Sequence, residues 1–322
     1  MKAIVARKYG SPDVLRFEEI EKPLLKEHQL LIKVHAASVN MYDWHMLTAD
    51  VFLVRLEAGL LKPKNIQCGA DLAGRVEAVG NAVTQFKPGD EVFGSGYGTF
   101  AEYARSRESA LVLKSVHMTF QQAAAIPMAG LTALQGLRDQ GQLQAGQKVL
   151  INGAGGGVGT FAVQIAKAFG AEVTAVCSTK NLEVASALGA DHVIDYTRTD
   201  FTRNGQRYDL IYAANGNRSA FAYMRALRPH GICVVAGGSM RQLAQVMLFG
   251  PLISKKGGRK LGTYMANINQ KDLSLMSELF ETGKVKPVID RSYPFSEIAE
   301  ALRYLGKGRA KGKVVVTMDS HG

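Results

Sequence analysis

The stretch from Lys148 to Cys177 restricts the possible folds more than any other part of this sequence. It reads KVLINGAGGGVGTFAVQIAKAFGAEVTAVC, in which an apolar run, a glycine cluster, an amphipathic segment and a second apolar run follow one another. This order predicts a buried strand, a tight turn, a helix and a second, parallel strand. At the turn stands Ala154-x-Gly156-x-x-Gly159, a variant of the GxGxxG pattern.

The glycines of this turn have a chemical use in such a setting. Gly155, Gly156 and Gly157 let the backbone approach a pyrophosphate, and the start of the helix offers free N–H groups. Gly159 permits close packing of the helix on the strand. The alternative is that the glycines only form a tight turn. We predict dinucleotide binding by the turn, which consists of Ala154, Gly155, Gly156, Gly157, Val158 and Gly159.

The end of the second predicted strand indicates which dinucleotide binds. A protein that binds NAD usually carries an acid there, about 20 residues after the glycines, to hold the ribose hydroxyls. This sequence has Ser178-Thr179-Lys180-Asn181 instead. A hydroxyl and an ammonium suit a 2′-phosphate, so Ser178 and Lys180 predict NADPH as the cofactor. The alternative is that Lys180 is a solvated surface lysine.

A chain of 322 residues is longer than one hydrophobic core usually supports, so we expect two domains. Up to about residue 120 the sequence predicts short strands between glycine-rich turns, which is typical of a mostly antiparallel β-domain. The expected strands are Ala3–Ala6, Gln29–Ala36, Gly74–Val79, Glu91–Phe93 and Phe100–Tyr103.

From about residue 120 helices alternate with strands, which indicates βαβ units. The expected helices are Gln121–Leu137, Gly157–Phe169, Asn181–Leu188, Ala220–Leu227 and Lys271–Thr282. The expected strands are Lys148–Asn152, Glu172–Cys177, His192–Ile194, Asp209–Tyr212, Ile232–Ala236 and Leu261–Tyr264. Six parallel strands predict a doubly wound sheet. The last stretch predicts a strand, a helix and a strand that rejoin the first domain.

Several further phrases carry a family resemblance. They are SVNMYDWHML from Ser38, GADLAGRVEAVGNAVTQFKPGDEVFG from Gly69, AAAIPMAGLTALQGL from Ala123, LGADHVIDY from Leu188 and GKVVV from Gly312. With the glycine turn, they resemble the medium-chain dehydrogenase/reductase superfamily, in its zinc-free quinone oxidoreductase (zeta-crystallin-like) branch. The resemblance implies an α/β fold with a GroES-like catalytic domain over residues 1–122, completed by 269–322, and a Rossmann domain over 123–268.

The same resemblance implies positions around the cofactor. Tyr196 would lie near the adenine-ribose phosphate beside Lys180, and Thr132 near the nicotinamide. Lys313 would approach the pyrophosphate. Asn215 follows the fourth strand of the parallel sheet, where the family carries an aspartate-containing phrase, and we include it among the cofactor contacts.

The resemblance also implies the chemistry. Zinc-dependent relatives would carry a cysteine near Asn40 and a His-Glu pair near Asp71, so we expect no metal. Hydride would then pass from the nicotinamide C4 to an activated acceptor, namely a quinone or the β-carbon of an enone. Asn40 is expected to donate to the acceptor oxygen, and Tyr42 or His45 to donate a proton or orient a water. Each of these three residues has a purely structural alternative.

The net charge of +11 suits a polyanionic partner. A dinucleotide with three phosphates is one such partner and nucleic acid is another, so a non-catalytic dinucleotide-binding or RNA-binding module is the alternative function. The sequence has no aromatic and basic RNA motif to favour it. A Rossmann methyltransferase is disfavoured by the preceding β-domain and the sixth strand. The basic stretch Lys255–Lys260 is expected to be a solvated loop.

The remaining predictions concern the surroundings of the site. The apolar loop Leu47–Lys64 is expected to cover a hydrophobic acceptor. Cys68, Cys177 and Cys233 show no CxxC spacing and are expected to be small core residues. The amino-terminal sequence lacks the long apolar stretch of a secretion signal, so we expect the cytoplasm. The resemblance implies a homodimer.

Overall fold

The computed structural model describes residues 1–216, 218–256 and 258–318. The chain forms two compact units, and each is described by itself. The first comprises residues 1–128, 268–281 and 289–322, and the second comprises 129–267 and 282–288. These limits differ from those of the predicted domains, 1–122 with 269–322 and 123–268. Residues 282–288 belong to the second unit because Lys286 exchanges two hydrogen bonds with the side chain of Gln164.

The first unit is built on a seven-stranded sheet with the order β14-β15-β3-β4-β5-β7, in which β6 also pairs with β3. Its pairings are antiparallel except for that of β14 with β15. The strands are β3 (Leu30–Val39), β4 (Asp71–Val79), β5 (Glu91–Ser95), β6 (Tyr103–Ser106), β7 (Leu111–Leu113), β14 (Ile289–Pro294) and β15 (Lys313–Thr317). A separate hairpin joins β1 (Lys2–Ala6) to β2 (Leu15–Glu19).

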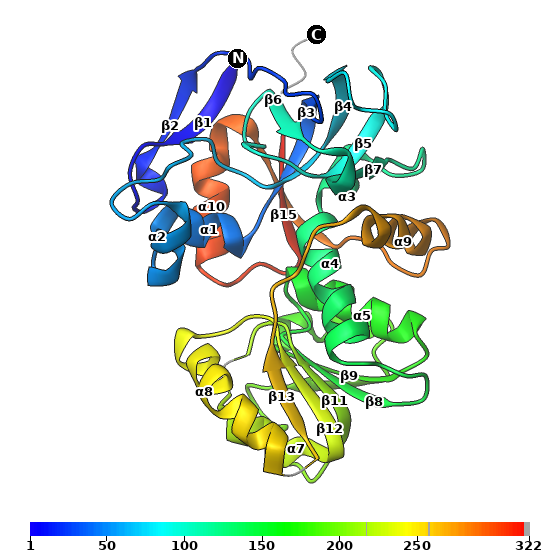
Figure 1. Cartoon of the computed structure of the whole chain (residues 1–322). Coiled ribbons are helices and arrows are strands. Elements are labelled where there is room, and N and C mark those ends of the chain that lie inside the picture. Colours follow the sequence, from blue (N-terminus) through cyan, green and yellow to red (C-terminus); the bar gives the residue numbers. More distant parts are fainter. Residues whose placement is uncertain (217, 257, 319–322) are drawn as a thin grey trace. The chain divides into compact units, whose positions relative to one another are not determined.

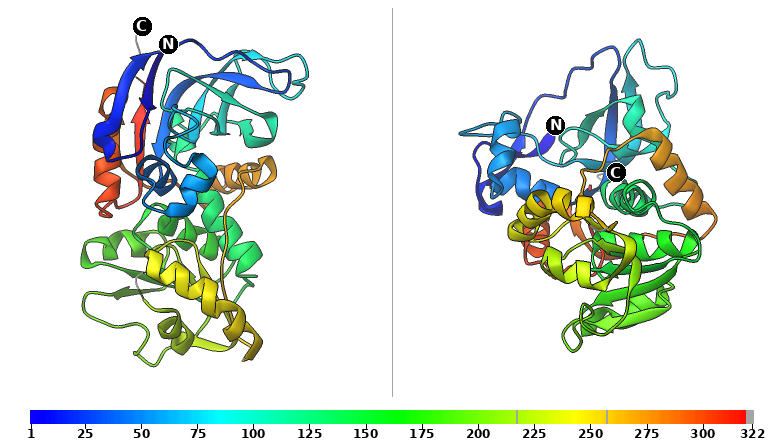
Figure 2. Two further views of the ribbon diagram at one scale, coloured as in Figure 1. Left: turned by 60° about the vertical axis from the view of Figure 1, so that its left-hand side comes forward. Right: turned by 60° about the horizontal axis from the view of Figure 1, so that its bottom comes forward.

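The α-helices of this unit flank its sheet. They are α1 (Met41–Thr48), α2 (Phe52–Ala58), α3 (Phe120–Ala124), α9 (Gln270–Glu281) and α10 (Ile298–Gly306). Short 3-10 turns cover Pro12–Val14, Glu108–Ala110 and Phe295–Glu297. Helix α1 lies beside α10 (Figures 1 and 2). The Trp44 ring packs so closely on Gly306 that an added Cβ there would lie 2.3 Å from the ring.

The second unit is a six-stranded parallel sheet with the order β10-β9-β8-β11-β12-β13. The strands are β8 (Lys148–Asn152), β9 (Glu172–Cys177), β10 (His192–Asp195), β11 (Tyr208–Ala213), β12 (Leu227–Val235) and β13 (Lys260–Thr263). This is the order of a doubly wound dinucleotide-binding sheet. The predicted α/β fold, with six parallel strands and a mostly antiparallel partner unit, is confirmed.

Helices connect these strands. They are α5 (Gly157–Ala168), α6 (Leu182–Ala187), α7 (Ala220–Ala226) and α8 (Met240–Lys256), with a 3-10 turn at Thr179–Asn181. Helix α4 (Pro127–Gln135) continues into a π-helical turn at Gly136–Gln140. Helix α8 lies beside the edge strand β13 (Figure 1). Val149, Leu150 and Ile151 of β8 are fully buried, as expected of a strand that is covered on both faces.

Several local predictions were wrong. The expected loop Leu47–Lys64 contains α2, because Ala49 adopts a left-handed conformation with φ 47° that ends α1 and lets a new helix begin. The strand expected at Phe100–Tyr103 begins only at Tyr103, since Phe100 instead accepts a hydrogen bond from Ile4 of β1.

Helix α8 and the strands β2 and β7 were not expected from the sequence. The residues before Pro251 continue as a helix through it, so that Lys255 and Lys256 end α8 and do not start a loop. Gly257 lies outside the described residues. The predicted carboxyl-terminal strand, helix and strand are present, and β15 pairs with β3 as a member of the first sheet.

Two of the three cysteines, Cys177 and Cys233, are buried as predicted, and Cys68 is half-buried. All three are free thiols. Within the described residues, none of the helices has the length and apolar character that crossing a bilayer requires.

Candidate functional site

The glycine-rich turn joins β8 to α5 in the second unit. Gly153 has a φ of +86°, and its N–H and that of Ala154 both donate to the carbonyl of Val176 in β9. A Cβ at Gly159 would lie 2.0 Å from the carbonyl oxygen of Gly153, so that position requires glycine. Gly156 is the N-cap of α5, and the following N–H groups have no intrahelical partners. The turn therefore has the backbone geometry that a pyrophosphate requires.

Asn181 borders this turn, and the sequence did not single it out as a contact. A Cβ at Gly155 would lie 2.2 Å from Asn181 Nδ2, so the amide lies directly against the glycine. Its Oδ1 atom is buried and has no hydrogen-bond partner within the described part of the chain. The signal available in the sequence was a polar residue, Asn181, shortly after the strand that follows the glycine turn.

The ends of β9 and β10 bring together three residues predicted to hold the 2′-phosphate. Asp195 pairs with Cys177 in the parallel register, and Tyr196 N donates to the Cys177 carbonyl at 3.1 Å. Ser178 and Tyr196 therefore leave the sheet side by side. Lys180 is exposed, and Tyr196 is 42% exposed. The structure thus places Ser178, Lys180 and Tyr196 at one edge of the sheet.

A carboxylate also lies at this edge, although the segment that follows β9, Ser178 to Asn181, carries none. Asp195 is 9% exposed and accepts hydrogen bonds from Thr179 Oγ1 at 2.5 Å and from Thr197 Oγ1 at 2.7 Å. Hydrogen bonds from these two hydroxyls hold the pKa of Asp195 below its ordinary value. Asp195 thus links the segment after β9, through Thr179, to the segment after β10, through Thr197. It was not predicted, because it belongs to β10 and the prediction of the cofactor rested on the end of β9.

Asn215 and Thr132 occupy different settings in the second unit. Asn215 is exposed next to the glycine turn, with its Cβ 3.1 Å from the place of a Cβ on Gly153. The Thr132 carbonyl in α4 accepts hydrogen bonds from Tyr264 and, at 3.1 Å, from Tyr212. The two tyrosine hydroxyls are 3.0 Å apart and lie where the helix turns into its π-helical segment.

In the first unit, Asn40 lies in a buried polar cluster with Asp71 and Lys313. Lys313 Nζ donates to Asn40 Oδ1, while Asn40 Nδ2 donates to Asp71 Oδ2 at 3.0 Å and to the Ser38 carbonyl at 3.3 Å. Asn40 is 6% exposed. Its amide is therefore already engaged as donor and acceptor. In this structure the amide hydrogens bind Asp71 and Ser38, and donation from Asn40 to the acceptor oxygen stays a prediction.

Lys313 is buried in the same cluster. It is 3% exposed, and its ammonium interacts with Asn40 and with the charges of Asp71 and Asp43. Its contact with the pyrophosphate stays a prediction. Burial lowers the pKa of Lys313, against the two carboxylates, which raise it.

The two carboxylates of the cluster are buried as well. Asp71 accepts from Ser38 Oγ at 2.9 Å and from the Met128 N–H at the start of α4. Burial raises the pKa of Asp71 and raises that of Asp43 to about 7. Asp43 Oδ2 accepts from the Asn40 N–H at 2.8 Å, which fixes the start of α1.

Helix α1 carries the other two predicted catalytic residues. Tyr42 is 48% exposed. His45 Nδ1 lies 2.7 Å from Asp50 Oδ1. Burial acts to raise the pKa of Asp50, but hydrogen bonding and charge from His45 outweigh it and lower that pKa. Asp50 occupies Nδ1, so Nε2 is the ring nitrogen that is left for other partners.

No group of three metal-binding side chains from His, Cys, Asp and Glu is found in the described ranges of the chain. Asp43 and Asp71 come closest in character, but the Lys313 ammonium already supplies a positive charge to both. A second cation would be repelled there, and these oxygen donors do not match the nitrogen and sulfur ligands that zinc prefers. The described residues around Asp43 and Asp71 therefore do not form a donor set that fits zinc.

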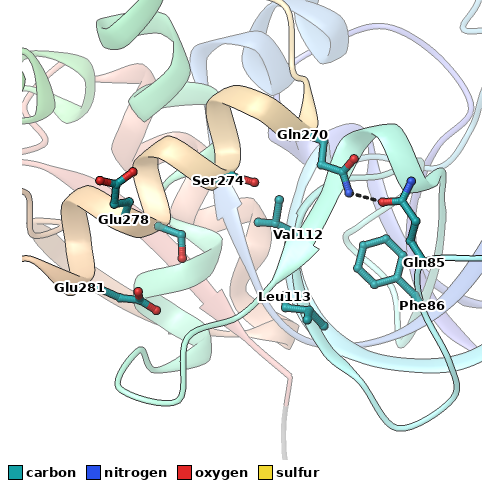
Figure 3. Close-up of a pocket in the computed structure, with 9 residues that line it drawn as sticks. Gln85, Phe86, Val112, Leu113, Gln270, Ser274, Glu278 and Glu281 are labelled. Atoms are coloured by element: carbon teal, nitrogen blue, oxygen red, sulfur yellow. Dashed lines mark hydrogen bonds between the residues drawn. The ribbon is translucent and has the colours of Figure 1, made fainter.

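A groove of about 400 Å³ runs between α9 and β7 in the first unit (Figure 3). Val112 and Leu113 form its floor, and Glu278 and Glu281 project from α9 at its edge. It contains none of the predicted site residues. Two carboxylates would repel an anionic dinucleotide, so this groove is not the cofactor site.

Comparisons with known proteins agree with this arrangement. Residues 26–116 match the family of alcohol dehydrogenase GroES-like domains, and residues 188–316 match the family described as zinc-binding dehydrogenase. The chain is 36% identical to the 2-methylene-furan-3-one reductase of Solanum lycopersicum and 35% identical to the chloroplastic NADPH-dependent alkenal/one oxidoreductase of Arabidopsis thaliana. Both alignments cover 98% of this chain and 79% of the relative.

Solved structures show the same similarity. The quinone oxidoreductase of Coxiella burnetii has a TM-score of 0.87 and 29% identity, over 98% of this chain and 99% of that one. The Escherichia coli quinone oxidoreductase, solved with NADPH, shares the fold with a TM-score of 0.84 at 23% identity, over 98% of this chain and 100% of that one. The chain belongs to the medium-chain dehydrogenase/reductase superfamily. Within it, the chain falls in the branch of quinone and alkenal oxidoreductases.

Proposed function

We propose that this protein transfers hydride from NADPH to a quinone or an α,β-unsaturated carbonyl compound. The observation that carries the proposal is the edge of the parallel sheet, where the glycine turn and the basic segment after β9 lie together. The relatives that reduce alkenals, enones and quinones support the class of acceptor. A non-catalytic binding module is not favoured, because relatives that match 98% of this chain are reductases.

The residues of the second unit would bind the cofactor. Backbone amides from Ala154 to Gly159 would hold the pyrophosphate, and Ser178, Lys180 and Tyr196 would hold the 2′-phosphate. Asn215 and Thr132 would contact the remaining part of the dinucleotide. NADPH, when bound, supplies a hydride from the nicotinamide C4.

The proton that completes the reduction needs a donor on this chain. Tyr42 and His45 are the candidates, and we favour His45 because Asp50 holds its ring in one orientation. In its charged form the imidazole donates from Nε2. Asn40 and Lys313 would act by fixing the start of the helix that carries both candidates.

Steady-state oxidation of NADPH and NADH with a panel of acceptors tests the reaction. We expect turnover with quinones and enones and none with saturated ketones, and a chelator should leave the rate unchanged. Activity restricted to saturated alcohols and lost with chelator would contradict the metal-free proposal. Nucleotide binding without turnover of any acceptor would favour the binding module.

The proton donor is tested by His45→Gln and Tyr42→Phe. We expect the glutamine variant to lose at least about tenfold in kcat, since a positioned acid contributes about 10²–10⁴-fold. Its affinity for NADPH should stay the same. The phenylalanine variant should retain most of its turnover, and the reverse pattern would assign the proton to Tyr42.

Cofactor choice is tested by Lys180→Ala. The variant should raise the Michaelis constant for NADPH by at least about tenfold, because a charge-assisted contact to the phosphate is lost. The constant for NADH should hardly change. An equal effect on both nucleotides would reject the role given to Lys180.

We also infer that two copies of the chain associate through the second unit. Strand β13 is an edge of the parallel sheet, and the adjacent α8 exposes Met247, Leu248 and Leu252 at 63%, 69% and 59%. Edge strands and exposed apolar patches are common sites of self-association. Light scattering should give a molar mass of twice 34.8 kDa for the unaltered protein and of 34.8 kDa for Leu248→Glu. Leu24→Glu, at an 88% exposed leucine of the first unit, is the control.

Location in the cytoplasm is a further proposal. Fractionation of cells that produce the tagged protein tests it. Recovery of the protein with membranes or with an organelle would contradict the proposal. Relatives assigned by name to chloroplasts and mitochondria make that outcome informative.

A further inference from the structure

Two copies of one short turn stand at the end of β10 and shortly after it in the chain. Residues 195–198 read DYTR and residues 200–203 read DFTR. In each copy the aspartate Oδ1 accepts two hydrogen bonds from the threonine two residues later, one from its N–H and one from its Oγ1. The distances are 2.9 and 2.7 Å in the first copy and 3.0 and 2.8 Å in the second. In each copy the arginine is three residues after the aspartate.

The two copies differ in what surrounds them. The first begins at the last residue of β10, and its Asp195 Oδ2 accepts from Thr179, next to Lys180. The hydroxyls of Thr179 and Thr197 are 3.3 Å apart, so the first turn is joined to the segment after β9. Tyr196 of this copy is 42% exposed.

The second copy places its aromatic ring in the interior of the unit. Its Phe201 is 1% exposed and packs in the core with Tyr223 at a ring distance of 6.1 Å. Arg218 Nη2 lies 3.9 Å from Asp200 Oδ1, and its guanidinium lies 6.0 Å from the Phe201 ring. The second copy is therefore part of the scaffold, whereas the first is open at the edge that carries Lys180.

Arg198 is the exposed cation of the open copy. Its side chain is 78% exposed, and Nε lies 3.7 Å from Asp195 Oδ2, which is too long for a hydrogen bond. The guanidinium donors therefore remain available to a ligand. Asp195 stays near by as an ionised group whose oxygens already accept three hydrogen bonds from Thr179 and Thr197.

We propose that Arg198 determines specificity for NADPH by binding its 2′-phosphate together with Lys180, and that Asp195 positions both residues. This inference rests on the proposed function. A guanidinium offers two parallel N–H donors that match two phosphate oxygens. Asp195 fixes the Lys180 side through Thr179 and the Arg198 side through its own turn.

The charges at this edge give the proposal a sharp consequence. When Arg198 is present, its positive charge balances the negative charge of Asp195. The charge of Lys180 then leaves this edge net positive. Without Arg198, the Asp195 carboxylate is left uncompensated beside the phosphate and repels it. Loss of Arg198 therefore removes a contact and exposes a like charge at the same time.

Calorimetric titration with NADPH, NADH and 2′-AMP tests this. Arg198→Ala should weaken NADPH and 2′-AMP by at least about tenfold, as expected for a charge-assisted contact. NADH should change by less than about twofold, because it lacks the phosphate that the arginine binds. Arg198→Lys should recover part of the loss, since it keeps the charge but not the paired donors.

Arg203→Ala is the matched control, because Arg203 occupies the same place in the second turn. Its Nε lies 4.0 Å from Asp200 Oδ2, and its side chain is 75% exposed. It should leave the affinities for all three ligands unchanged. An Arg198→Ala variant with the NADPH-to-NADH ratio of the unaltered protein would overturn the inference. If the unaltered protein binds neither nucleotide, it is the proposed function that fails.

Discussion

The polar cluster of the first unit and the sheet edge of the second use similar side chains in opposite ways. In the first unit, Asn40, Asp71 and Lys313 are at most 6% exposed, and they bind one another. At the sheet edge, the side chains of Lys180 and Arg198 are exposed to solvent. The comparison shows that buried charges which satisfy each other build the scaffold, whereas charges that remain in solvent are available to a ligand.

Lys313→Met should have the largest effect, because it breaks the buried side of this comparison. It leaves Asp71 and Asp43 buried without their cation, and removing one partner of a buried charge pair costs about 3–5 kcal/mol. Denaturant unfolding followed by circular dichroism measures the loss. A loss below about 1 kcal/mol would mean that the cluster does not hold the first unit together.

Gly159→Ala should have the next largest effect. It disturbs the glycine turn at the sheet edge of the second unit and removes no charge. The new methyl would meet the Gly153 carbonyl at 2.0 Å, and such crowding costs about 1–3 kcal/mol. NADPH affinity should fall by more than about tenfold, since the turn can no longer hold its shape. In Gly156→Ala the methyl lies 3.6 Å from the same oxygen, so stability should be kept. Equal stability losses in the two variants would reject this account of the turn.

Asp43→Asn should have a smaller effect, which appears as a change in how the free energy of unfolding depends on pH. Burial raises the pKa of Asp43 to about 7, so the folded protein binds a proton that the unfolded chain releases near pH 4. Stability from this group is present at low pH and falls as pH rises toward 7. The asparagine keeps the acceptor for the Asn40 N–H but does not titrate. Between about pH 4 and pH 7 the free energy of unfolding of the variant should therefore rise relative to that of the unaltered protein. A difference between the two proteins that does not change with pH would contradict the assignment.

Lys167→Met should have the smallest effect, and it matches Lys313→Met in chemistry. Lys167 Nζ lies 2.8 Å from both oxygens of Asp191, but the two side chains are 33% and 36% exposed. Exposed ion pairs contribute about 0–1 kcal/mol. The same unfolding measurement serves for both variants. Similar losses in the two would remove the distinction between buried and exposed charge on which the comparison rests.

Some of the site was readable from the sequence because its signals are local. The glycine turn, the strand before it and the helix after it involve neighbouring residues, and the structure places them as expected. Ser178 and Tyr196 lie together because each follows its strand directly, and parallel strands end at one edge. Asp195 and Asn181 escaped notice, since their importance depends on contacts with the neighbouring strand and the turn.

Other features of the site depend on partners that are remote in the sequence. The family resemblance led us to expect Asn40 at the acceptor and Lys313 at the pyrophosphate. In the structure these two side chains bind each other, and no local pattern in the sequence shows that contact. Helix α8 escaped because a proline and a glycine inside it obscure its pattern.

The sequence by itself determined the six strands of the parallel sheet, the glycine turn and the residues that follow each of these strands, since these depend on spacing over a few positions. Only the tertiary structure decided which charges are buried and which are open. Lys313 and Asn40 are separated by 273 positions, and they meet because β15 pairs with β3. Whether a charge serves the scaffold or a ligand depends on such distant partners, because desolvation is set by everything that packs around the group.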